Sequence, residues 1–280
     1  MTSYPEKKFA ASTIEVNYAE GPDNGPPMVL IHGLGGRWPN WEPVMDLFAS
    51  DWHVYALDLR GHGDSGRTPD GYEFNHYPNE VIEFLKQVVK EPAFLVGHSL
   101  GGVTAAGVSA RNSELVAAAA LEDPPLYIRE WFDESDFAPV FKQILEIRNK
   151  NLDEKKTAIE LRKIDQKSSD EAIFMRAIAV TKADPGIWEA VVSGRSNENW
   201  NPDDVLSANP LPTLLMQANP DLGGALRDVE ADRANELLGL GRYVKWDDSG
   251  HGMHNEYPER FVQLVNAFFR QVLRRRGEVS

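Results

Sequence analysis

The sequence contains no cysteine. A chain without thiols forms no disulfide, offers no thiolate nucleophile and supplies no cysteine ligand to a metal. The absence is typical of proteins that work in a reducing compartment, and a cytoplasmic location is therefore expected.

Positive charge is also scarce, with 29 basic against 43 acidic residues and a formal net charge of -14. Such a surface repels phosphate backbones and anionic lipid, so neither nucleic acid nor a membrane is expected as a partner. No apolar run follows Lys7 and Lys8, and no stretch approaches the length of a membrane span, so no signal peptide or transmembrane helix is predicted. A small molecule is the expected partner.

Short, continuous apolar runs recur along the chain, and each is bounded by turn residues. Runs without polar alternation are typical of strands that helices cover on both faces, as in a parallel sheet. The predicted strands are residues 27–32, 53–58, 93–97, 116–121, 213–217 and 243–246. Helical patterns alternate with them at residues 77–90, 100–111, 232–238 and 258–275, which predicts an α/β fold.

One long segment breaks this alternation. Residues 126–205 are charged, and helical patterns occur at 141–149, 153–167 and 171–181. We therefore predict a core formed by residues 1–125 and 206–280, with 126–205 inserted as a helical cap.

The first chemical motif is GHSLG at residues 97–101, which matches G-x-S-x-G directly after a predicted strand and before a helical pattern. In that setting the serine lies on a sharp turn that projects its hydroxyl group, and only glycine tolerates the crowding on either side. Ser99 is therefore the predicted nucleophile. A capping serine in an ordinary glycine-rich turn is the alternative.

A second glycine-rich segment, HGLGG at residues 32–36, follows the strand predicted at 27–32. Its backbone N–H groups are suited to bind an oxyanion, and the amides of Leu34 and Leu100 are the two expected donors. A dinucleotide site is disfavoured because the G-x-G-x-x-G pattern is not completed.

Together these motifs carry a resemblance to a known family. The chain resembles the α/β-hydrolase fold superfamily, in particular serine esterases and lactonases with a helical cap, at HGLGG (32–36), DLRGHGDS (58–65), GHSLGG (97–102), GHGMH (250–254) and EYPERF (256–261). The resemblance implies a mostly parallel central sheet flanked by helices, a catalytic triad and no cofactor. It also implies that residues 58–65 are a structural signature rather than part of the chemistry.

A serine hydroxyl needs a base within hydrogen-bond reach, and a neutral imidazole suits that work. His251 follows the last predicted strand, where the family places its catalytic histidine, so His251 is predicted ahead of its neighbour His254. A His-x-x-His metal pair is conceivable there, but neither H-E-x-x-H nor a third ligand accompanies it, so no metal is predicted.

The acid that orients the histidine stays open between two residues. Asp221 follows the strand predicted at 213–217, which is the commoner family position, although Ala218 and Pro220 depart from the usual pattern. Glu122 ends the apolar strand after the nucleophile helix, where some members carry their acid. Asp123 beside it is interpreted as a turn residue before proline, and Asp228 is a more distant candidate.

The expected reaction is hydrolysis of a carboxylic ester or lactone through an acyl-enzyme. Trp38, Trp41, Trp131 and Trp188 are candidates to line the substrate pocket, although packing is the commoner role for each buried aromatic. Carbon–carbon bond hydrolysis, perhydrolysis and ligand binding without turnover are the alternatives that this fold leaves open.

Overall fold

The computed structural model describes residues 4–68 and 70–277, and its strands form one sheet in the order β1-β2-β4-β3-β5-β6-β7-β8. From β4 to β8 neighbouring strands run parallel, while β1 pairs antiparallel with β2 and β2 with β4. The strands are β1 (Glu6–Ala10), β2 (Glu15–Glu20), β3 (Pro27–Ile31), β4 (His53–Leu57), β5 (Ala93–His98), β6 (Val116–Glu122), β7 (Thr213–Gln217) and β8 (Gly241–Lys245).

The predicted α/β class and mostly parallel sheet are confirmed. Every residue of β3, β6 and β7 is buried, which agrees with the missing polar alternation in those runs. The strands β1 and β2 were not predicted. β1 is almost entirely exposed and lies at the edge of the sheet, so its sequence carries little of the apolar pattern that identifies a strand.

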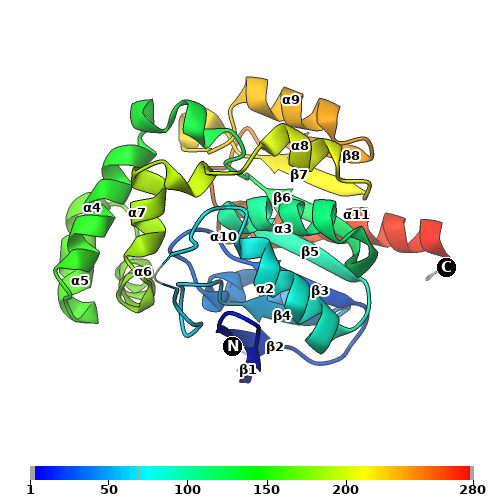
Figure 1. Ribbon diagram of the computed structural model, residues 1–280, viewed down its shortest axis with the longest axis horizontal. Coiled ribbons are helices and arrows are strands. Elements are labelled where there is room, and N and C mark those ends of the chain that lie inside the picture. The colour runs from blue at the N-terminus through cyan, green and yellow to red at the C-terminus, as the bar shows by residue number, and fades with distance from the viewer. Residues whose placement is uncertain (1–3, 69, 278–280) are drawn as a thin grey trace.

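Helices cover both faces of the sheet, and a separate apolar core lies under each face (Figure 1). One core receives side chains from α2 (Tyr77–Phe84), α3 (Leu100–Arg111), α8 (Pro202–Ser207) and α9 (Asp228–Leu237). The other receives them from α1 (Glu42–Phe48), α10 (Met253–Glu256) and α11 (Pro258–Arg276). Alternate residues of the central strands point into the two cores, as a pleated strand requires.

Between β6 and β7 the chain forms a series of helices: α4 (Phe137–Asn149), α5 (Glu154–Ile164), α6 (Asp170–Lys182) and α7 (Gly186–Val192), followed by α8. The first four lie together at one end of the molecule, away from the end of α11 (Figure 1). They occupy the segment predicted as a cap. The outer limits of the predicted core, residues 1–3 and 278–280, lie outside the described residues.

Four short single-turn segments lie between the longer elements: η1 (Trp38–Trp41), η4 (Ile128–Glu130), η5 (Phe132–Glu134) and η7 (Pro220–Leu222). Within residues 4–68 and 70–277, no helix combines the length and the apolar character needed to cross a membrane.

Candidate active site

Ser99 lies in a tight turn between β5 and α3, with φ 54° and ψ -117°, a backbone conformation that non-glycine residues rarely adopt. The turn requires close backbone approaches. A Cβ atom added to Gly97 would lie 2.2 Å from the Gly101 carbonyl oxygen, and one added to Gly101 would lie 1.9 Å from that of Ile31. Glycine at both positions therefore permits the turn that presents Ser99 at the carboxyl end of the sheet.

His251 lies in the loop after β8 and pairs with the carboxylate of the residue that follows β6. Its Nδ1 atom is 2.6 Å from Oδ2 of Asp123. The Asp123 side chain is fully buried, whereas the His251 side chain is 27% exposed. A carboxylate on Nδ1 fixes the ring orientation and the tautomer, and leaves Nε2 as the atom able to accept a proton.

Asp123 itself is held by three backbone donors from the loop after β7. Its oxygen atoms accept hydrogen bonds from the N–H groups of Ala225 at 2.7 Å, Ala218 at 3.2 Å and Leu226 at 3.3 Å. The residue has a left-handed backbone with φ 43°, which aspartate tolerates better than most side chains. These donors satisfy a carboxylate that would be costly to bury without partners.

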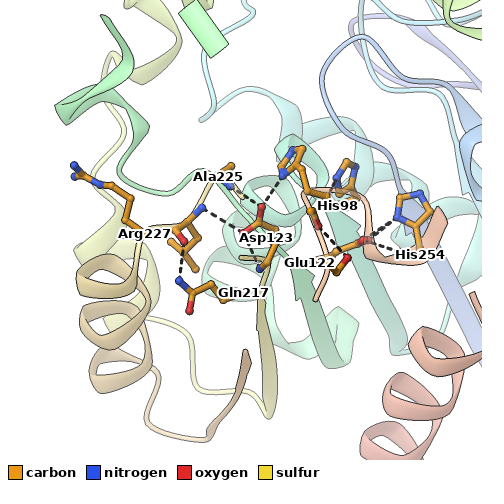
Figure 2. Close-up of polar contacts among 12 residues, drawn as sticks. His98, Glu122, Asp123, Gln217, Ala225, Arg227 and His254 are labelled. Carbon is orange, nitrogen blue, oxygen red and sulfur yellow. Dashed lines mark hydrogen bonds and ion pairs between the residues drawn. The ribbon is translucent and has the colours of Figure 1, made fainter. Parts of the chain in front are cut away.

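Glu122, one of the two acids predicted for His251, pairs instead with His254. The Glu122 carboxylate accepts from the His254 backbone N–H at 2.9 Å and lies 2.8 Å from His254 Nδ1. Figure 2 shows Glu122 directed toward His254 and Asp123 directed toward Ala225, on the other side. The prediction chose the right strand end but the wrong neighbour. The left-handed turn at Asp123 directs its carboxylate toward His251, while the carboxylate of Glu122 contacts His254.

Asp221, the other predicted acid, is exposed in η7 and is hydrogen-bonded through its backbone N–H to Asn219 Oδ1 at 2.9 Å. Asp228 pairs with Lys245 and accepts from Gln217. Among the described residues the carboxylate that contacts His251 is thus Asp123, and the assignment of Asp221 or Glu122 as its partner is corrected.

The strand register contains the signal that identifies Asp123. His98 of β5 lies opposite Glu122 of β6, so Ser99 and Asp123 are the next residues along two adjacent parallel strands. This relation depends on the pairing of β5 with β6, which the sequence does not reveal.

Ser99 and His251 line one small cavity of about 30 Å³, together with Leu34 and Leu100. Leu100 is the first residue of α3, so its N–H belongs to the first helical turn, where intrahelical acceptors are absent. Among the described residues no hydrogen bond joins Ser99 Oγ to His251. In enzymes without bound substrate, hydrogen bonds between catalytic groups are often long, so this geometry does not argue against such a pair. The remaining lining is apolar: Phe74, Pro125, Ile128, Phe137, Phe141, Val191 and Ala225.

Two buried histidines support the loop that contains Leu34. The Gly35 N–H donates to His62 Nε2 at 3.0 Å, and the Leu59 N–H donates to His32 Nε2 at 3.1 Å. Burial lowers the pKa of His32 to about 4 and that of His62 to about 3, so both rings are neutral acceptors at pH 7. Residues 58–65 thus act on the loop as structural support, as the family resemblance implied.

None of the four tryptophans predicted near the substrate lines the Ser99 cavity, although Trp41 lines a larger cleft that Leu34 also borders. Trp38 and Trp41 belong to the core under α1 and α11, and Trp188 packs against Gly35 from the opposite core. Trp131 lies under the Arg227 guanidinium group, 4.8 Å from its carbon to the ring centre. The aromatic side chains that line the Ser99 cavity are instead Phe74, Phe137 and Phe141.

The sheet, the turn at Ser99 and the His251 loop are those of a hydrolase fold, and the family model for the alpha/beta hydrolase family matches residues 28–264. The chain belongs to this family. Over 92 residues it is 35% identical to the (E)-2-((N-methylformamido)methylene)succinate hydrolase of Acinetobacter baylyi, covering 33% of this chain and 35% of that protein. Over 105 residues it is 32% identical to the 2-(acetamidomethylene)succinate hydrolase of Mesorhizobium japonicum, covering 38% of each.

These matches span little more than a third of the two curated relatives. The likeness in structure is more extensive. The crystal structure of E-2-(acetamidomethylene)succinate hydrolase superposes with a TM-score of 0.79 at 20% identity, covering 96% of this chain and 100% of that one. At this identity the superposition shows the shared fold.

Proposed function

We propose that the chain hydrolyses a carboxylic ester or lactone, with Ser99 as nucleophile, His251 as general base and Asp123 as the acid that orients His251. The observation that carries the proposal is that Ser99 and His251 line one cavity, while the buried carboxylate of Asp123 contacts Nδ1 of the same histidine. Asp123 takes the role that the sequence suggested for Asp221 or Glu122.

In the proposed reaction His251 Nε2 accepts the Ser99 hydroxyl proton as Oγ attacks the substrate carbonyl carbon. The amides of Leu34 and Leu100 donate to the developing oxyanion, and the positive end of α3 adds to this stabilisation. Collapse of the tetrahedral intermediate breaks the ester bond, and the leaving alkoxide takes the proton from His251. Water, deprotonated by His251, then attacks the acyl-enzyme and releases the carboxylic acid and Ser99.

The apolar lining of the cavity favours a compact, uncharged group next to the reacting carbonyl. We assign residues 126–205 the role of a cap because their side chains Ile128, Phe137 and Phe141 close this cavity. The two curated relatives are named as hydrolases of substituted succinates, which supports a small organic substrate. A cytoplasmic location stays a prediction from composition.

Replacing Ser99 with alanine tests the proposal. Turnover of a short-chain p-nitrophenyl ester is expected to fall by a factor of about 10⁶, because the covalent route is lost. A far-ultraviolet circular dichroism spectrum identical to that of the wild type shows that the variant is folded. A folded Ser99→Ala variant that retains wild-type turnover would falsify the nucleophile assignment.

A further inference from the structure

A second, larger cleft opens beside the loop that carries Leu34. Its volume is about 750 Å³, and it lies between residues 33–37, η1 and α10 on one side and α6 on the other. Leu34 and His98 line the cleft, and Leu34 also lines the Ser99 cavity. The cleft is therefore adjacent to the proposed reaction centre, and Leu34 is the residue at which the two meet.

Arg37 lines this cleft as a buried cation. The residue is 9% exposed, and its buried Nε atom has no hydrogen-bond partner among the described residues. Asp58, a buried carboxylate that feels the charge of Arg37, is already bound by other donors, namely Trp38 N–H, Asp64 N–H and the Asn17 amide. A guanidinium group removed from water without a bonded partner is costly, and it is shaped to bind a carboxylate through two parallel hydrogen bonds.

The opposite wall does not neutralise Arg37. Asp165 there accepts from the Ser168 hydroxyl at 2.6 Å and lies 3.8 Å from the Arg176 guanidinium, so it is already occupied. Glu42 and Glu171 also border the cleft, but both are exposed, and charges in water interact weakly over distance. Arg176 also lines the cleft, and its charge and that of Asp165 offset each other.

We propose that this cleft is an anion subsite in which Arg37 binds a carboxylate group of the substrate. The inference rests on the proposed hydrolase function, because it identifies the substrate as an ester or lactone that also carries a free carboxylate. The uncharged, apolar cavity at Ser99 then receives the reacting end, and the carboxylate lies beyond Leu34, next to Arg37.

Matched esters test the inference. We compare mono-p-nitrophenyl esters of dicarboxylic acids of increasing chain length with the same compounds whose free carboxylate is capped as a methyl ester. Wild-type enzyme is expected to prefer the anionic member at one chain length by at least tenfold in kcat/KM. In Arg37→Gln this ratio should fall by at least tenfold, mainly through KM, and Arg37→Lys should give an intermediate ratio because it keeps the charge without the planar fork.

Arg270→Gln is the matched control. Arg270 lies on α11, does not line the cleft and pairs with Asp51, so its replacement should leave the kcat/KM ratio unchanged. A wild-type enzyme with equal kcat/KM for the two members at every chain length overturns the inference, whatever the variants do. So does an Arg37→Gln variant that keeps the wild-type ratio.

Direct binding separates this inference from the proposed function. Titration calorimetry with glutarate on the wild type should give an affinity at least tenfold higher than on Arg37→Gln, even if neither protein turns over an ester. Glutarate binding without any hydrolysis would retain the subsite and refute the hydrolase proposal. Equal glutarate affinities, or inorganic phosphate binding more tightly than glutarate, would overturn the assignment to a carboxylate.

Discussion

Two carboxylate–histidine pairs lie next to each other in this molecule, built from consecutive acids at the end of β6. Asp123 contacts His251 Nδ1 at 2.6 Å, and Glu122 contacts His254 Nδ1 at 2.8 Å. Both acids are fully buried, but the His254 side chain is 2% exposed and that of His251 is 27% exposed. The two pairs therefore differ in how accessible the histidine ring is.

The second ring nitrogen of His254, Nε2, is already occupied by a neighbouring side chain. This nitrogen lies 2.9 Å from the Asn255 side-chain amide, and the His254 ring lies against Trp41 at 4.4 Å between centres. His251 instead lines the Ser99 cavity. A buried carboxylate on Nδ1 is thus compatible with either role, and access to Nε2 decides which of the two histidines is suited to proton transfer.

The largest expected difference between the pairs is in turnover. Replacing His251 with glutamine should lower kcat for a p-nitrophenyl ester by a factor of about 10⁴ or more, because the general base is lost. His254→Gln removes the equivalent ring of the second pair and should lower kcat by less than tenfold. Steady-state kinetics on both variants measures this contrast, and equal losses would remove the functional distinction.

The second pair should matter more for stability. Glu122→Gln removes a buried carboxylate that accepts hydrogen bonds from His254 and is expected to lower the free energy of unfolding by about 3 kcal/mol. Urea unfolding at pH 7 measures the change, and kcat should stay within tenfold of the wild type at a temperature where the variant is folded. A stable Glu122→Gln enzyme without activity would assign Glu122 to the chemistry instead.

His98 lies between the two pairs, with ring centres 4.6 Å from His251 and 5.0 Å from His254. Burial, followed by the charges of these two neighbours, lowers its pKa well below 6.5. The folded protein therefore keeps His98 neutral while the unfolded chain takes up a proton below about pH 6.5, so this residue makes the protein less stable as the pH falls.

His98→Gln should remove that contribution. The loss of unfolding free energy between pH 7 and pH 5 is expected to be smaller than in the wild type by up to about 2 kcal/mol. Urea unfolding of both proteins at the two pH values measures the difference. Identical pH dependence in the two proteins would show that His98 is not kept neutral by the fold.

Much of this account was predictable from local patterns. The apolar runs predicted six of the strands, and the glycines around Ser99 predicted the turn, because both depend on neighbours in the sequence. The choice of acid depends on which residue of β6 lies opposite Ser99, a relation between strands. The position of Asp123 before Pro124 suggested a turn, and its left-handed backbone is indeed a turn conformation, but that turn also directs the carboxylate toward His251.

The tryptophans were misplaced for a related reason. The residue type alone does not show which way a tryptophan side chain points. The packing of η1 and α7 against the two cores places Trp38, Trp41 and Trp188 outside the Ser99 cavity. Arg37 was not singled out from the sequence either. Its isolation as a buried cation depends on Asp58 being bound by other donors, which is a property of the folded loops.

The central claim is that Asp123 orients His251, and kcat of Asp123→Asn measured against Asp221→Asn tests it most directly. Asp123→Asn is expected to lower kcat by about 10⁴, as loss of the orienting carboxylate does in other serine hydrolases. Asp221→Asn, an exposed substitution of the same chemistry, should leave kcat unchanged. Full activity in Asp123→Asn, or a loss confined to Asp221→Asn, would contradict the account.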